Sequence, residues 1–265
     1  MLKDITLGQY FPGNTVIHRL DPRTKLIAVL LYIVALFQAK GWVGYAAVLL
    51  ASLGCMALSR LKPKVIFKGL KPMIFIIALT GVLNIFYTSG TPILPGWIIT
   101  WEGIARAIQM VLRIVLLITG TFLLTYTTSP IALTDGLELL LNPLKKLRFP
   151  VHEMTIMMSM ALRFIPTLIE ETDKIMSAQK ARGADFETGS LMDRAKALLP
   201  VLVPLFVSAF RRADELAVAM ESRCYHGGEG RTRMKQLIFQ GRDYIALALG
   251  ILLLAGIIGL KKLGI

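Results

Sequence analysis

The chain has 265 residues, of which 55% are hydrophobic and only 18% are charged, and its formal net charge is +13. A soluble domain of this length carries more charge, so the composition predicts an integral membrane protein. The basic residues stand beside apolar stretches and are not spread along the chain. That pattern indicates membrane topology and argues against a nucleic-acid partner.

Five apolar stretches are predicted to cross the membrane as helices, since one crossing needs roughly 20 mainly apolar residues. The first begins at Asp21 and Pro22, a favourable N-cap followed by proline at the first helical position, and it runs to about Ala39. The other four comprise residues 42–58, 72–87, 104–126 and 244–260. We therefore expect an all-α, polytopic membrane protein in three parts. These are four spans in residues 1–128, a cytosolic helical module in residues 129–241 and a last span in residues 242–265.

The basic residues predict which side of the membrane each connection occupies. They precede the first span, cluster between the second and third, and follow the fourth: Arg19, Arg23, Lys25; Arg60, Lys62, Lys64, Lys68, Lys71; Lys145, Lys146, Arg148. The positive-inside rule then places the N-terminus in the cytosol and the C-terminus outside. Lys261 and Lys262 oppose this orientation, but lysines at a helix end can snorkel to the interface.

Two further apolar runs, residues 151–169 and 197–210, complicate the count of crossings. If both crossed the membrane, the connection between them would carry five basic residues to the outside: Lys174, Lys180, Arg182, Arg194 and Lys196. Because this contradicts the bias of the other connections, we prefer long helices at or under the cytosolic membrane face. Seven crossings is the alternative.

Two segments in this region resemble each other at a constant offset. Asp173 to Arg182 and Asp214 to Arg223 each begin with an aspartate and end with an arginine, and 214 − 173 and 223 − 182 both give 41. A guanidinium at a helix end offers a rigid set of donors that grips a carboxylate in two places. One such arginine alone is best explained as a solvent-exposed cation favoured by the helix dipole. Two at the same offset predict a pair of docking sites.

The sequence contains none of the common catalytic motifs. A Gly-rich loop with Lys-Ser/Thr is absent, and His152-Glu153 lacks the second histidine of a zinc-hydrolase motif. Cys55 and Cys224 are too few and too far apart for a metal site or a disulfide framework. We therefore predict no catalytic residues, no metal site and no enzyme.

Arg113 and a methionine-rich stretch each allow two interpretations. Arg113 lies deep in the fourth span and should face other helices or water, where a structural pairing is favoured over a role in transport. The methionines are either core residues or an adaptable contact surface for a second membrane protein: Met154, Met157, Met158 and Met160.

Three segments resemble one family, the transmembrane T component of energy-coupling factor (ECF) transporters, which import vitamins and metal ions. Gly8-Gln9-Tyr10 followed by His18 to Leu26 (HRLDPRTKL) resembles its N-terminal signature. Residues 179–183 (QKARG) resemble its first Ala-Arg-Gly motif, and residues 219–225 (AMESRCY) occupy the place of the second. The resemblance covers essentially the whole chain.

The resemblance implies a scaffold in the plasma membrane of a prokaryote. It would join two cytosolic ABC-type ATPases to a small substrate-binding membrane protein, the S component, with several S components expected to be interchangeable. ATP would be bound by the ATPases, so no cofactor is expected in this chain. The implied ATPase-docking residues are Ala181, Arg182, Gly183, Ser222, Arg223 and Cys224, and the implied S-component contact is the methionine stretch.

The second motif departs from the family pattern, because Ser222 and Cys224 flank its arginine where the family has alanine and glycine. Glycine adopts left-handed backbone angles at little cost, so it stays open whether the chain turns at Cys224 or later, at Gly227-Gly228. A different function, a self-sufficient secondary transporter or channel, would need a polar pathway within the membrane. Only Arg113 hints at such a pathway.

Overall fold

The computed structural model describes residues 10–92, 99–147, 149–186, 188, 190–227 and 236–263. These residues form α-helices joined by short turns, with one isolated bridge between Pro92 and Thr100. Of the residues discussed above, Gly8, Gln9, Arg148 and Gly228 lie outside the described part. The chain divides after residue 140 and again after residue 236. The bundle unit comprises the described residues of 10–140 and 237–263, and the two-helix unit those of 141–236.

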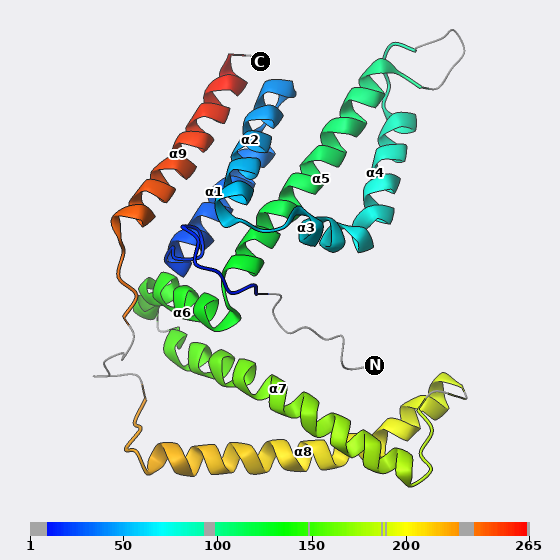
Figure 1. Ribbon diagram of the computed structural model, residues 1–265, viewed down its shortest axis with the longest axis vertical. Helices are drawn as coiled ribbons and strands as arrows, with labels where there is room; N and C mark the ends of the chain where they lie inside the picture. The colour runs from blue at the N-terminus through cyan, green and yellow to red at the C-terminus, as the bar shows by residue number, and fades with distance from the viewer. Residues whose placement is uncertain are drawn as a thin grey trace. The chain divides into compact units, whose positions relative to one another are not determined.

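The bundle unit contains the helices that the sequence predicts to cross the membrane (Figure 1). Helix α9 packs beside α1, and α5 packs against α4, α2 and α1. The helices are α1 (Pro22–Gln38), α2 (Gly41–Ser59), α3 (Pro63–Leu70), α4 (Ile74–Tyr87), α5 (Trp101–Thr127), α6 (Pro130–Leu141) and α9 (Gly241–Lys262).

Length and composition support the all-α, polytopic interpretation. Within the described residues, four helical segments are long and apolar enough to cross a membrane: Gly41–Ser59, Pro63–Tyr87, Trp101–Thr127 and Gly241–Lys262. Helix α1 has 17 residues, which is the lower end of the range for a span. Neither α1 nor the long helices of the two-helix unit are among the four, so the counts of five and seven crossings both stay predictions.

The start of α1 follows the prediction. The Asp21 side chain accepts a hydrogen bond from the Arg23 backbone N–H, and Pro22 occupies the first turn. Helix α1 ends at Gln38, and Gly41 begins α2 with a φ of 68°. A left-handed angle is cheap for glycine, which explains how two helices follow each other with so short a break.

The basic connection between the second and third spans is itself helical, which sequence reasoning did not foresee. Helix α3 and the 3-10 turn Lys71–Met73 lead directly into α4, so the predicted start of the third span at Pro72 falls inside the continuous helical segment Pro63–Tyr87. Ile66 and Leu70 are buried in a cluster with Tyr126, while the lysines of α3 are exposed. This apolar face opposite lysines is typical of a helix that lies along a membrane interface.

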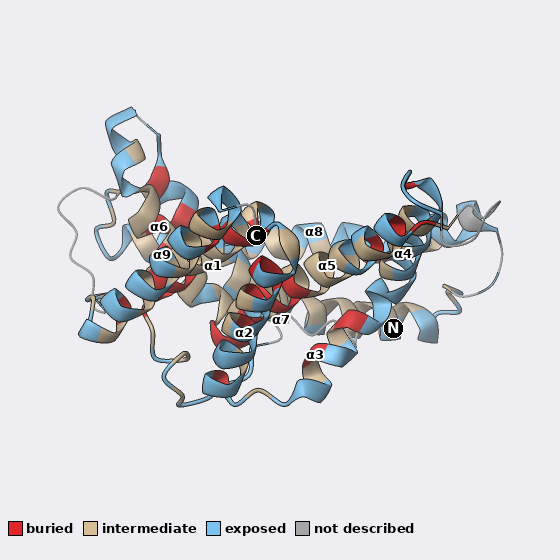
Figure 2. Cartoon of the chain, turned by 90° about the horizontal axis from the view of Figure 1, so that it is seen from above, coloured by how far each residue is buried: buried red, intermediate tan, exposed pale blue. Residues whose placement is uncertain are grey.

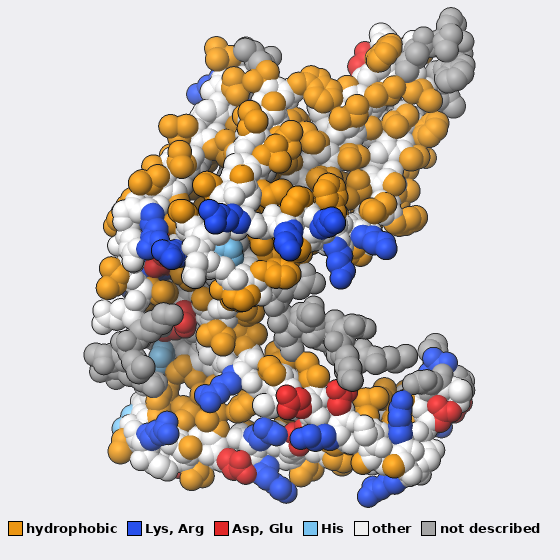
Figure 3. All heavy atoms as spheres, in the orientation of Figure 1, with side chains coloured by type: hydrophobic (Ala, Val, Ile, Leu, Met, Phe, Trp, Pro, Cys, Tyr) orange, Lys and Arg blue, Asp and Glu red, His pale blue; other side chains and the backbone are white. Residues whose placement is uncertain are grey.

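The outer surface of the bundle is apolar along its length and basic at one end. Buried residues lie where helices face each other, and large apolar side chains elsewhere are exposed (Figure 2). A row of Lys and Arg side chains crosses the base of the bundle (Figure 3). That end holds the start of α1, the end of α2 and α3, whereas Lys40, Lys261 and Lys262 lie at the other end (Figure 1). The bundle thus has a more basic and a less basic end, and which side of the membrane each end faces stays a prediction.

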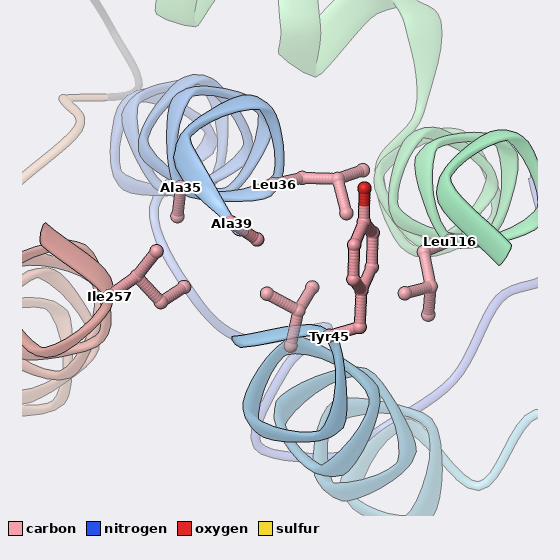
Figure 4. Packing of buried hydrophobic residues seen from close by; sticks show 7 residues of the cluster. Ala35, Leu36, Ala39, Tyr45, Leu116 and Ile257 are labelled. Carbon is pink, nitrogen blue, oxygen red and sulfur yellow. The ribbon is translucent and has the colours of Figure 1, made fainter. Parts of the chain in front are cut away.

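The core of the bundle joins four helices (Figure 4). Small residues at the end of α1 allow close approach to side chains of α2, α5 and α9. The Tyr32 hydroxyl donates to the Leu116 backbone oxygen at 2.9 Å, which satisfies the hydroxyl inside the apolar core. The cluster consists of Ala35, Leu36, Ala39, Tyr45, Val48, Leu116 and Ile257.

The two-helix unit is built from α7 (Val151–Ala181) and α8 (Leu191–Glu221), each of 31 residues. A 3-10 turn, Asn142–Leu147, precedes them. Ser190 caps α8 by exchanging hydrogen bonds with Asp193, a capping box that fixes where the helix begins. The two helices run in opposite directions and cross.

Candidate docking sites at two helix ends

The end of α7 is a tight turn closed by backbone hydrogen bonds. The N–H groups of Arg182 and Ala184 both donate to the Gln179 oxygen at 3.0 Å, and the Gly183 N–H donates to Lys180 at 3.0 Å. Gly183 has a φ of 87°, the left-handed angle that such a helix end requires. Arg182 is therefore presented at the rim of the turn by a fixed backbone.

The end of α8 repeats these three backbone hydrogen bonds, 41 residues later. The N–H groups of Arg223 and Tyr225 donate to the Met220 oxygen at 3.1 and 3.0 Å, and the Cys224 N–H donates to Glu221 at 2.8 Å. Cys224 has a φ of 54°, so it takes the position of Gly183. The question left open by the sequence is thus answered in favour of a turn at Cys224. Gly227 has a positive φ of its own but is not needed to end the helix.

Both arginines are exposed and available to a partner. Among the residues that the structure describes, neither the Arg182 nor the Arg223 guanidinium has an ion-pair or hydrogen-bond partner. The residues that flank the arginines are exposed as well: Ala181, Gly183, Ser222 and Cys224. The Ser222 hydroxyl donates a hydrogen bond to the Val218 backbone oxygen. The carbonyl ends of the helices favour a cation at these positions by roughly 0.3–1 kcal/mol.

The two helices are joined through positions that also differ by 41. The Arg212 guanidinium donates to the Glu171 carboxylate at 2.9 Å, and the Ser208 hydroxyl donates to the same carboxylate. The Ser208 hydrogen bond, together with Arg212, lowers the pKa of Glu171. The differences 182 − 171 and 223 − 212 are both 11, so each arginine lies about 16 Å of helix beyond this pair. The arginines consequently stand at opposite ends of the unit (Figure 1).

The Gln179 side chain of the first motif forms a second bond between α7 and α8. Pro204 lacks an N–H group and cannot donate to the Pro200 oxygen, as an ordinary residue would four positions along a helix. The Gln179 side chain donates to that oxygen at 3.4 Å. This role of Gln179 was not predicted, although two prolines four residues apart in a helical run indicate a free carbonyl.

The methionine stretch is mostly surface. Met154, Met157 and Met158 are 39, 60 and 42% exposed, whereas Met160 is half-buried. For the first three, a contact surface therefore fits better than a core. Helix α8 also exposes an apolar stripe that sequence reasoning treated only as a candidate crossing. Its members recur at helical spacing: Leu199, Val203, Phe206 and Phe210.

Arg113 faces neighbouring helices, as its depth in the span led us to expect. Its guanidinium lies 5.9 Å from the Phe37 ring centre of α1 and 5.6 Å from the Tyr45 ring centre of α2. Cation–π attraction of this kind is worth more where water is excluded. The arrangement supports the structural interpretation over a role in transport.

The N-terminal signature holds three helices together at the basic end. Asp243 at the start of α9 accepts from the Asp21 N–H at 2.8 Å, and Arg23 donates to the Leu237 oxygen at 2.8 Å. Lys25 donates to the Thr127 oxygen at the end of α5 at 2.9 Å. The signature therefore fixes the segments that lead out of α5 and into α9. Sequence reasoning identified the motif but not these partners.

Comparison with known proteins agrees with the resemblance. A family model described as "Cobalt transport protein" (CbiQ) matches residues 13–234. Proteins named energy-coupling factor transporter transmembrane protein EcfT are similar over nearly their full length. That of Clostridium kluyveri is 55% identical over 250 residues, 93% of each chain, and that of Bacillus subtilis is 52% identical over 246 residues, 92% of this chain and 93% of the relative.

A more distant relative extends the comparison. The EcfT protein of Lactococcus lactis is 45% identical over 245 residues, 91% of this chain and 92% of the relative. These names are those of a transporter component, and none of them indicates an enzyme. With apolar helices suited to crossing a membrane, the chain belongs to the family of transmembrane EcfT proteins of energy-coupling factor transporters.

Proposed function

We propose that this chain is the energy-coupling scaffold of an ECF-type ABC importer. Arg182 and Arg223 each pair with an acidic residue on one of two cytosolic ABC-type ATPases. Movement of α7 and α8, driven by ATP binding in those partners, reaches a separate S component and releases vitamins or other micronutrients into the cell. In this proposal the N-terminus and the two-helix unit are cytosolic, and the C-terminus is external.

The observation that carries the proposal is the equality of the two helix ends. Each turn has the same three backbone hydrogen bonds, one left-handed residue and an exposed arginine. Two related ATPase subunits need two related contacts. Both arginines lie 11 residues beyond the Glu171–Arg212 pair, so the same length of helix connects each contact to that pair. The exposed methionines of α7 and the apolar stripe of α8 supply adaptable surface for exchangeable S components.

Substitution of the arginines tests the proposal. Arg182→Ala or Arg223→Ala should leave the chain in the membrane, weaken ATPase association roughly tenfold or more and abolish ATP-coupled uptake. Lysine should rescue poorly, because it lacks the two-pronged geometry of a guanidinium. The measurements are co-purification of ATPases with the tagged chain and uptake by intact cells.

Matched controls are available on the same helices. Arg163 of α7 and Arg211 of α8 are exposed and have no ion pair within the described ranges, so their alanine variants remove the same charge away from the turns. Both controls should behave as the unmodified chain. Normal uptake by the Arg182→Ala, Arg223→Ala double variant would refute the proposal. A secondary transporter would also purify without ATPases, an outcome that would favour that alternative.

A further inference from the structure

An open groove of about 480 Å³ lies on the bundle unit beside the C-terminal end of α2. Apolar side chains form its wall: Leu53, Met56, Ala57 and Leu61. Two cations, Arg60 and Lys62, line it together with Pro63. The groove thus combines an apolar wall with a cationic edge, and neither the docking turns nor the N-terminal signature contributes to it.

The backbone at one of these cations, Arg60, adopts a left-handed angle. Arg60 has a φ of 54°, its N–H donates to Ala57 at 3.2 Å, and the Leu61 N–H donates to the Ser59 hydroxyl at 3.4 Å. A left-handed angle at a residue other than glycine costs free energy and persists only where neighbouring contacts impose it. Arg60 and Lys62 are both exposed and have no ion pair in the part of the chain described by the structure.

The groove lies at the junction of α2 and α3, the end of the bundle at which Figure 3 shows a row of Lys and Arg side chains. Leu53 and Leu58 of α2 are 49 and 58% exposed, as expected for a surface that faces acyl chains. Helix α3 continues the basic edge with exposed Lys64 and Lys68 and leaves Phe67 70% exposed. A ligand of this groove therefore spans the boundary between hydrocarbon and headgroups.

We propose that the groove binds an anionic phospholipid. Its phosphate pairs with Arg60 and Lys62, and an acyl chain lies along Leu53, Met56 and Leu61. A free phosphate would leave the apolar wall uncovered, and a zwitterionic lipid would bring its own cation to two cations that have no ion pair among the described residues. An apolar protein helix would bury both cations without compensation, which is costly. Basic residues at a helix end near the lipid headgroups attract anionic lipids in preference to neutral ones.

Lipid binding by the full chain in detergent tests this inference, with phosphatidylglycerol as the probe and native mass spectrometry as the readout. The Arg60→Gln, Lys62→Gln variant should lose affinity by about 25-fold, or about fivefold for each cation removed. The matched control is Lys64→Gln, Lys68→Gln, which removes the same charge from α3 outside the groove. The affinity of this control for phosphatidylglycerol should fall by less than about fivefold, which on a logarithmic scale is less than half of the loss in the groove variant. Phosphatidylcholine should bind no better to the unmodified chain than to the groove variant.

Three results would overturn the inference. They are unchanged phosphatidylglycerol binding in the groove variant, an equal loss in the Lys64, Lys68 control, or competition by inorganic phosphate at the concentration of the lipid. The second indicates diffuse surface charge, and the third a soluble anion. A Leu53→Gln, Leu61→Gln variant keeps both cations, and it too should weaken binding, because it removes the apolar wall. Thermal melting of each variant in lipid-free detergent verifies that the bundle is intact. Since none of these variants touches Arg182 or Arg223, the outcome is independent of ATPase docking.

Discussion

At the residue scale, the two docking turns depend on single left-handed residues. A Cβ at Gly183 would meet nothing within 4 Å, so Gly183→Ala is opposed only by its φ of 87° and should destabilise the turn by about 1–2 kcal/mol. Amide hydrogen exchange at Ala184, whose N–H closes the turn, should accelerate about tenfold. Cys224→Gly should have the opposite effect and slow exchange at Tyr225, because glycine removes the penalty.

The control for this prediction is Gly256→Ala in α9, where a Cβ also has open space but φ is not positive. It should leave exchange at both turns unchanged. Unaltered exchange at Ala184 in Gly183→Ala would mean that backbone strain does not govern the turn. The sequence predicted the arginines and the offset of 41, but it could not decide that Cys224 would adopt the strained angle. That angle follows from the closing bond of Tyr225 to Met220, which no local preference of cysteine indicates.

At the scale of the elements, the pairing of α7 with α8 should depend on pH. Hydrogen bonds from Ser208 and Arg212 keep the pKa of Glu171 below its usual value of about 4.3. The stabilisation is therefore fully present above that usual value and is lost as the pH falls through the lower pKa of the folded state. The distribution of distances between spin labels on the two helices, measured at decreasing pH, should broaden in this acidic range.

Glu171→Gln should make this distance independent of acid pH, because the titrating group is gone. Asp193, whose pKa is lowered by Ser190 in the capping box, also titrates in this range, so Asp193→Asn is the control that retains the response. A pH response that persists in Glu171→Gln would show that another group controls the pairing. The element boundaries illustrate the limit of sequence reasoning here. Both helices were expected, but the Glu171–Arg212 and Gln179–Pro200 contacts depend on how the helices cross, which periodicity does not encode.

At the scale of the whole molecule, the fold was largely predictable, because apolar length and the clustering of cations determine which segments enter a membrane and which side they face. The predicted spans correspond to α1, α2, α4, α5 and α9. Helix α3 was missed because it has only eight residues and its lysines suggested a loop. The partners of the N-terminal signature were missed because Asp21 and Asp243 are far apart in the chain and meet only after α1 and α9 have packed.

The buried Asp243 should be essential to the stability of the bundle. It is 1% exposed and accepts the N–H groups of Asp21 and Gln240, each at 2.8 Å. Asp243→Ala leaves both donors without an acceptor and should cost roughly 2–4 kcal/mol, whereas Asn retains one carbonyl oxygen and should cost less. Thermal unfolding in detergent should rank alanine below asparagine and asparagine below the unmodified chain. Equal midpoints for all three would show that this contact is dispensable.

Site-specific cross-linking in the intact transporter can establish whether the two equivalent arginine turns engage two ATPases. A photoreactive residue placed at Ala181 and, in a separate variant, at Ser222 lies beside each arginine without replacing it. We expect each position to cross-link to an ATPase subunit and, where the two ATPases differ, each position to select one of them. Cross-links to lipid alone, or to no ATPase from either position, would contradict this expectation.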